Sequence, residues 1–132
     1  MAIQPRYIDA QVIAPSAART TTFTSQIFTN DPLLYTGMMF FLNITASSGT
    51  PNLVVKVQYV DPITGTAVVD VPSGAFAAKT GTGQDTLVIH PAVTASANRQ
   101  VASPLTGYFL VVGTMTGGTP NMTYTIVGVP IR

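Results

Sequence analysis

One histidine and five aspartates are the residues of this chain that could do acid–base chemistry, because cysteine and glutamate are absent. A Ser-His-Asp triad would use His90 as its base, but the sequence has no Gly-x-Ser-x-Gly elbow to present a nucleophilic serine. His90 directly precedes Pro91 at the end of the run Thr86–His90, which indicates a strand-end histidine that bonds to nearby backbone. We therefore expect no catalytic residue and a protein that is not an enzyme.

Metal binding needs ligands that cluster, and His90 has no cysteine, glutamate or second histidine to complete a zinc site. Asp61 and Asp70 could approach each other across a 61–71 hairpin, but calcium usually needs more oxygen ligands than two carboxylates. Asp61 is better explained as a turn former. The glycine-rich stretch 79–84 is not a phosphate loop, because its lysine precedes the glycines and no helix follows. We expect no metal and no cofactor.

Sugar recognition is a further possibility for a β-rich chain. Carbohydrate-binding β-sandwiches usually present exposed aromatic platforms, and this chain has no tryptophan. Five tyrosines remain, of which strand alternation directs Tyr59 and Tyr124 toward the core. A carbohydrate-binding adhesion module stays open as an alternative function, and it would require exposed tyrosine clusters.

Few charged side chains are present to recruit a partner. Charged residues make up 8% of the chain against 46% hydrophobic ones, and the net charge is +1. The basic residues are dispersed, so we expect no nucleic-acid partner. No apolar stretch approaches the roughly 20 residues of a membrane span, so we expect no membrane partner. A surface rich in Thr, Ser, Ala, Gly and Pro suits a protein covered by neighbours in an assembly, with a threonine-rich monomer as the alternative.

Short β-prone runs separated by Pro, Gly or Asn-Asp breaks predict an all-β fold. In the run Leu53–Val60, alternation places Lys56 and Gln58 on the outside. The core-facing set of that run is Leu53, Val55, Val57 and Tyr59. About eight strands fit an antiparallel two-sheet β-sandwich of jelly-roll-like type, in which the weakly patterned second strand suits an edge or an interface. The expected strands lie near residues 6–13, 20–28, 37–45, 53–60, 66–71, 86–90, 107–114 and 122–129.

Two stretches repeat one pattern, FFLNITASSGTPNLVVKVQYV at residues 40–60 and FLVVGTMTGGTPNMTYTIVGV at residues 109–129. In each, one β-prone run enters a Gly-Thr-Pro-Asn turn and another leaves it, which predicts two similar hairpins in one sandwich. Convergent β-sequence is the alternative explanation. Asp61–Gly65 predicts a further tight turn. The predicted structural turn residues are Gly49, Pro51, Asn52, Asp61, Gly65, Gly118, Pro120 and Asn121.

Two segments do not fit the sandwich pattern. Residues 1–19 are expected to form a partly extended N-terminal arm or a first strand, ahead of a single β-sandwich domain over residues 20–132. Residues 91–105 predict a long exposed loop that is either disordered or in contact with a partner. The candidate interface residues on or beside these segments are Arg6, Tyr7, Arg19, Arg99 and Gln100.

The run from Leu42 to Phe76 resembles a pattern recurrent in small structural proteins of tailed-bacteriophage virions. The elements of that pattern are a Gly-Thr-Pro turn, an alternating strand ending in Gln, an Asp turn closing on Gly, an Asp-hydrophobic pair and Gly-Ala-Phe. In this chain they are Gly49–Pro51, Val55–Gln58, Asp61–Gly65, Asp70–Val71 and Gly74–Phe76. The segment from Gly107 to Pro130 is similar to the same family's ending. The chain departs from the family at Val68 and Val69, where a tryptophan is frequent.

The resemblance implies a β-sandwich with a place in the virion, on the head, and it implies no catalysis. We expect a capsid decoration or cement protein that binds the major capsid protein of the assembled head, with a homotrimer favoured. A head-fibre, tail or connector component is the alternative from the same particle. Pro5, Arg6 and Asp9 stand where a secretory signal would need its apolar region, so we expect synthesis in the host cytoplasm and a final location on the capsid surface.

Overall fold

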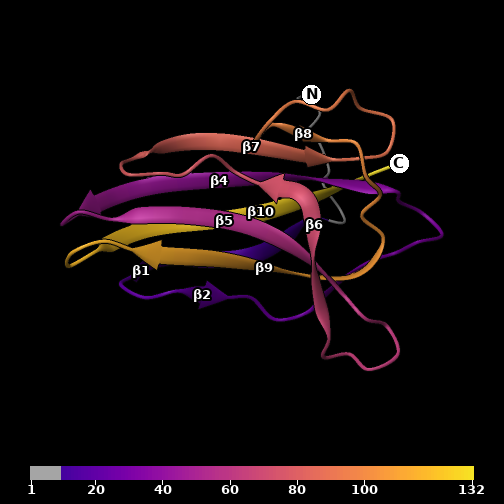
Figure 1. Cartoon of the computed structure of the whole chain (residues 1–132), viewed down its shortest axis with the longest axis horizontal. Helices are drawn as coiled ribbons and strands as arrows, with labels where there is room; N and C mark the ends of the chain where they lie inside the picture. The colour runs from indigo at the N-terminus through magenta and orange to yellow at the C-terminus, as the bar shows by residue number, and fades with distance from the viewer. Residues whose placement is uncertain (1–9) are drawn as a thin grey trace, which may run out of the picture.

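A computed structural model describes residues 10–132, and all of the regular elements in that range are β-strands (Figure 1). They are β1 (Gln11–Arg19), β2 (Phe23–Thr24), β3 (Phe28–Asn30), β4 (Gly37–Ser48), β5 (Asn52–Val60), β6 (Val68–Ala75), β7 (Gly83–Ile89), β8 (Gln100–Val101), β9 (Gly107–Thr116) and β10 (Asn121–Ile131). Two sheets pack over one hydrophobic core, and every strand pair is antiparallel except β7 with β8. The predicted all-β sandwich is confirmed.

The order of the strands defines a jelly roll. Sheet A has the order β1-β10-β4-β7-β8, and sheet B has the order β2-β9-β5-β6, with β3 also pairing with β9. The pairs are nested along the chain, because β1 pairs with β10, β2 and β3 with β9, β4 with β7, and β5 with β6. Nested pairs distributed over two facing sheets are the mark of the jelly roll.

Alternation along the strands separates the core from the surface. On β5, Leu53, Val55 and Val57 are buried, whereas Lys56 and Gln58 lie on the other side of the sheet and are only partly covered, as the sequence pattern predicts. Tyr59 was also expected to face the core, but it packs there only partly buried, and the next residue, Val60, is buried. Successive side chains of a strand point to opposite faces, so one face of each sheet faces the core.

Three aromatic rings join the two sheets inside the sandwich. Phe109 of β9 is fully buried and lies with its ring centroid 5.9 Å from that of Phe28 on β3 and 5.9 Å from that of Phe40 on β4. The pair with Phe28 is stacked, and the pair with Phe40 is edge-to-face, both favourable arrangements for aromatic rings. Because β4 belongs to sheet A and β9 to sheet B, this cluster holds the sheets together.

The prediction of two hairpins is wrong for both copies of the repeat. In the first copy β4 lies in sheet A and β5 in sheet B, and in the second copy β9 lies in sheet B and β10 in sheet A. Each turn therefore carries the chain from one sheet to the other. The copies pair with each other, β4 with β10 and β5 with β9. A Gly-Thr-Pro-Asn turn reverses the chain in either arrangement, and the distant strand partners decide which one forms.

The two repeated turns meet at one end of the sandwich, on the left of Figure 1. The Thr50 N–H and hydroxyl both donate to the Gly118 carbonyl oxygen, at 3.1 and 2.8 Å, and the Gly118 N–H donates to the Thr50 hydroxyl at 3.0 Å. The backbones lie so close that a Cβ on Gly49 would overlap the Thr119 carbonyl, and one on Gly117 would overlap the Thr50 carbonyl. This contact is termed the turn joint.

Other elements differ from prediction in extent. The strand expected near 20–28 is two short strands, β2 and β3, at the edge of sheet B. Of the strand expected near 6–13, residues 6–9 lie outside the described residues; residues 11–13 belong to β1, which pairs with β10, so this part of the expected arm is a strand. The 91–105 segment contains β8, with Val101 buried, which the sequence did not predict. The described residues therefore contain ten strands, where about eight were expected.

The core contains a tyrosine whose hydroxyl is unsatisfied. Tyr124 is fully buried, and its hydroxyl has no hydrogen-bond partner among residues 10–132. Burial raises the pKa of Tyr124, and the positive charge of Arg19 opposes this with a smaller effect. The folded protein consequently holds the Tyr124 proton at pH values where the unfolded chain releases it. This contribution to stability is complete below about pH 10 and is lost as the pH rises through the raised pKa.

We expect Tyr124→Phe to raise the free energy of unfolding by about 1 kcal/mol at pH 7, because it removes a buried hydroxyl without a partner. The variant should also lose less stability than the wild type above about pH 10. Urea denaturation across this pH range measures both effects. Lower stability at pH 7, or an unchanged alkaline slope, would show that the hydroxyl is satisfied.

Candidate interaction surfaces

His90 lies at the end of β7 with both ring nitrogens bonded to the fold. Its Nδ1 accepts a hydrogen bond from the Ala92 N–H at 3.0 Å, which places the proton of the neutral ring on Nε2. Nε2 lies 2.8 Å from the Arg132 carbonyl oxygen and 3.0 Å from Thr36 Oγ1. His90 thus links the loop after β7 to the segment before β4 and to the residue after β10, which is a structural role.

Asp61 and Asp70 are held by separate partners. Asp61 Oδ1 accepts the N–H of Ile63 at 2.9 Å in the β5–β6 turn, and this bond is the main reason that the pKa of Asp61 is lowered. Asp70 accepts a hydrogen bond from Gln58 at 2.7 Å and pairs with Lys56 at 3.2 Å, and these contacts, the glutamine first, lower its pKa. Within residues 10–132 no three His, Cys, Asp or Glu side chains gather where they could hold a metal ion.

Arg19 is engaged with its own fold. Its guanidinium lies 4.4 Å from the ring centre of Tyr124 and 4.6 Å from that of Phe23. It also donates hydrogen bonds at 2.6–3.2 Å to backbone carbonyl oxygens, those of Pro15, Ala17 and Tyr124. These contacts fasten β1 to β10 across the end of the strand. Arg19 therefore stabilises the contact between β1 and β10.

The other candidate interface residues fall in two places. Arg6 and Tyr7 lie outside the described residues. Arg99 and Gln100 are exposed beside a hollow of about 380 Å³ between β6 and the β7–β9 connection. The amide of Asn98 donates to the Ala75 carbonyl oxygen at 3.1 Å and fixes that connection to β6. The structure thus places Arg99 and Gln100 together, away from the strand end that holds Arg19.

Three connections lie at the end of the sandwich opposite the turn joint, spread from the top to the bottom of the right side of Figure 1. This loop end is formed by residues 31–36, 61–67 and 90–99. Two of these loops begin with Asp-Pro, and in each the aspartate accepts a hydrogen bond from the residue two positions on, Leu33 or Ile63. Leu33 is 91% exposed and Ile63 is 92% exposed. The loop end therefore presents two aliphatic side chains on turns braced by hydrogen bonds.

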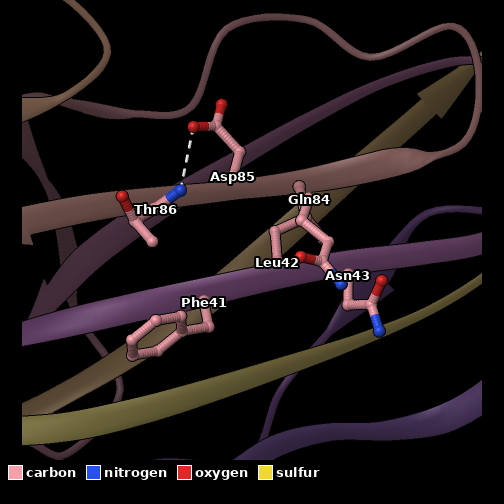
Figure 2. Close-up of a pocket in the computed structure, with 6 residues that line it drawn as sticks. All are labelled: Phe41, Leu42, Asn43, Gln84, Asp85 and Thr86. Atoms are coloured by element: carbon pink, nitrogen blue, oxygen red, sulfur yellow. Dashed lines mark hydrogen bonds between the residues drawn. The ribbon is translucent and has the colours of Figure 1, made fainter.

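The outer face of sheet A carries a hollow of about 420 Å³ between β4 and β7 (Figure 2). Figure 2 shows Phe41 and Asn43 on β4 beside Gln84 and Thr86 on β7. Phe41 is paired with Thr86, and Asn43 with Gln84. The hollow is open, and its lining adds Leu42 and Asp85 to the aromatic ring and the uncharged polar groups; Asp85 is paired with Lys79.

A second hollow, of about 500 Å³, continues the first on the other side of Phe41 and Asn43. It is lined by Ala10, Met39, Phe41, Asn43, Thr125, Val127 and Val129. The strand register places Phe41 beside Val127, and Met39 beside Val129. Phe41 therefore forms a ridge between two hollows, and the lining of the larger one is mainly apolar.

Together these positions form one surface, termed the A face. It consists of the outward side chains of four strands, Val12 on β1, Thr123, Thr125, Val127 and Val129 on β10, Met39, Phe41, Asn43 and Thr45 on β4, and Gln84, Thr86 and Val88 on β7. None of these side chains is charged. By contrast, the outer side of sheet B carries the Lys56–Asp70 ion pair. The two outer faces thus differ in charge.

Sequence reasoning did not single out the A face, although a signal for it exists. The run GMMFFLNI at residues 37–44 is apolar at consecutive positions up to Leu42, whereas a strand with one solvent-exposed face should alternate with polar residues. Met39 and Phe41 are the outward apolar members of that run, and Asn43 is its outward polar member. A strand that is apolar on both sides indicates that both sides are covered.

No protein-family model matches this chain, and no curated protein matches its sequence. The fold is similar to that of a chain in the solved structure of infectious bursal disease virus, Gt strain. The two chains are 13% identical with a TM-score of 0.52, and the match covers 92% of this chain. This chain spans 33% of the length of the viral chain. At this identity the likeness concerns the fold alone, a jelly-roll β-sandwich.

Proposed function

We propose that this chain is a structural protein of a virion, and specifically a decoration protein that binds the assembled head of a tailed bacteriophage. The observation that supports the proposal most is the fold, whose likeness to a chain of a virus structure extends over 92% of the chain. The resemblance of Leu42–Phe76 to small virion proteins of tailed phages supports the same class. In this proposal the protein is not an enzyme and uses no cofactor.

The proposed mechanism is mechanical. A protein that binds only the assembled shell adds its binding free energy to the assembled state, so the shell becomes harder to disrupt. The proposed partner is the major capsid protein, and a homotrimer would match three-fold or quasi-three-fold positions of a shell. The protein would be made in the host cytoplasm and end on the capsid surface, without a nucleic-acid or membrane partner.

The loop end is the surface that we propose to contact the head. Leu33 and Ile63 are almost fully exposed there, and the hydrogen bonds of Asp31 and Asp61 hold their turns in shape. A braced turn loses less conformational entropy on binding than a free one. Burial of an Ile or Leu side chain contributes about 1.5–3 kcal/mol, so these two positions would dominate the contact.

Purified protein mixed with undecorated heads should cosediment with them to a saturating ratio. Ile63→Ser should weaken this binding by at least about 10-fold, because the isoleucine no longer buries apolar area against the shell. Val69→Ser is the matched control, since Val69 is 67% exposed on β6 and lies outside the loop end. Equal binding by both variants would remove the loop end from the contact.

Electron microscopy of particles bearing labelled protein separates the proposal from its alternatives. A decoration protein labels the whole shell, whereas a tail or connector component labels the tail or one vertex. Binding to a glycan array without binding to heads would favour an adhesion module instead.

A further inference from the structure

The A face is an apolar surface on the outside of the sandwich. Phe41 is 42% exposed and Val12 is 59% exposed, and they lie on opposite sides of Val127, which pairs with both. Met39 and Val129, a neighbouring cross-strand pair, extend the apolar area along the same strands. A contiguous apolar patch on a small domain marks an interaction surface more often than single exposed apolar residues do.

Absence of charge makes this face suited to contact with the same protein. When two copies of one chain meet, any charge in the contact must find a partner or lose its hydration, and like charges repel near a symmetry axis. The twelve outward residues of the A face carry no charge, so burying the face leaves no charged side chain of its own without a partner. The outer side of sheet B would have to bury Lys56 and Asp70.

The A face is large enough to form the centre of a contact between two copies of the chain. Four strands about 4.8 Å apart and seven residues along β4 at about 3.3 Å each give a flat area of about 400 Å². A specific interface buries roughly 800 Å² on each partner, so the A face would form the centre of such a contact and neighbouring residues the rest.

Contact through strand edges is disfavoured by the structure. β1 contains Pro15 and two register shifts, and β6 contains Pro72 beside a register shift with β5. The remaining edge strands are only two or three residues long, namely β2, β3 and β8. Proline, bulges and short edge strands all hinder addition of a further strand. An assembly of this chain would therefore use a face.

We propose that a second copy of this chain covers the A face, with Phe41 at the centre of the contact. A dimer would pair the face with itself, and a trimer would place it against a different surface of the neighbour; both bury Phe41. The proposal concerns the free protein in solution, so it stands or falls independently of head binding.

Sedimentation velocity and light scattering of the full chain test the proposal. The wild type should be oligomeric at micromolar concentration. Phe41→Asp should raise the dissociation constant of the oligomer at least about 30-fold, an effect typical of replacing a residue at the centre of an interface. Tyr108→Asp is the matched control, because Tyr108 is also 42% exposed and aromatic but lies on the outer side of sheet B. It should leave the oligomer intact.

Phe41→Thr provides a second variant in case the aspartate disturbs the sheet, since threonine suits a strand. It should keep the wild-type circular dichroism and still weaken the oligomer. A monomeric wild type, or an oligomer that tolerates both Phe41 variants, would overturn the proposal.

Discussion

Phe109→Ala is expected to lower the free energy of unfolding by about 3–5 kcal/mol, because the fully buried ring leaves a cavity where the sheets meet. The loss includes its stacked contact with Phe28 and its edge-to-face contact with Phe40. For a domain of this length the midpoint of thermal unfolding should fall by roughly 10–20 °C. Calorimetry or urea denaturation of the purified variant measures the change.

Tyr108→Ala is the control for this substitution, since Tyr108 precedes Phe109 on β9 and points away from the core. Its effect should stay within about 1 kcal/mol. Comparable losses of unfolding free energy for the two variants would mean that Phe109 does not face the core and Tyr108 does not face away from it. The assignment of the core would then be wrong.

Gly117→Ala is expected to cost at least about 2 kcal/mol, because two penalties combine at one position. Gly117 has φ +113°, a backbone conformation that residues with a Cβ rarely adopt. The added Cβ would also overlap the Thr50 carbonyl oxygen across the turn joint, and that oxygen belongs to backbone that cannot rotate away. The turns would have to separate, which would break the hydrogen bonds between Thr50 and Gly118.

Gly81→Ala is the control, because a Cβ at Gly81 meets nothing within 4 Å and its φ lies outside the positive region. This variant should unfold within about 0.5 kcal/mol of the wild type. Denaturation curves for the two alanine variants thus compare a glycine that the turn joint requires with one that it does not. A neutral Gly117→Ala would show that the two turns are not in contact.

Much of the fold follows from local sequence. The alternation in Leu53–Gln58 predicts which side of β5 is buried, because a strand presents successive residues to opposite faces. Proline and glycine breaks place most strands to within a few residues, as at Asp61–Gly65, where Gly65 has φ +69° and its N–H donates to the Asp61 carbonyl oxygen. These features depend on neighbouring residues and so can be read locally.

The features of the fold that the sequence could not predict depend on strand pairing between segments that are far apart in the chain. The turn at Gly49–Asn52 is compatible with a hairpin, and only the pairing of β4 with β10 and of β5 with β9 sends its two strands into different sheets. β8 has two residues and forms because β7 offers it an edge. Neither outcome is encoded in the turn or the short strand itself.

The surroundings of the candidate interface residues depend on the folded chain. Arg99 and Gln100 are exposed in the connection between β7 and β9, whereas Arg19 contacts carbonyl and aromatic groups that only folding brings together. Phe41 was overlooked because an apolar residue in an apolar strand looks like core. The face to which it points depends on strand register, a property of the whole sheet.

The measurement that bears most directly on the proposed function is the disruption temperature of undecorated phage heads, with and without a saturating amount of this protein. Binding across subunit boundaries should raise that temperature and approach a fixed number of copies per head, and heat-unfolded protein should do neither. Heads that neither bind the folded protein nor change their disruption temperature would contradict the proposal that this chain is a decoration protein.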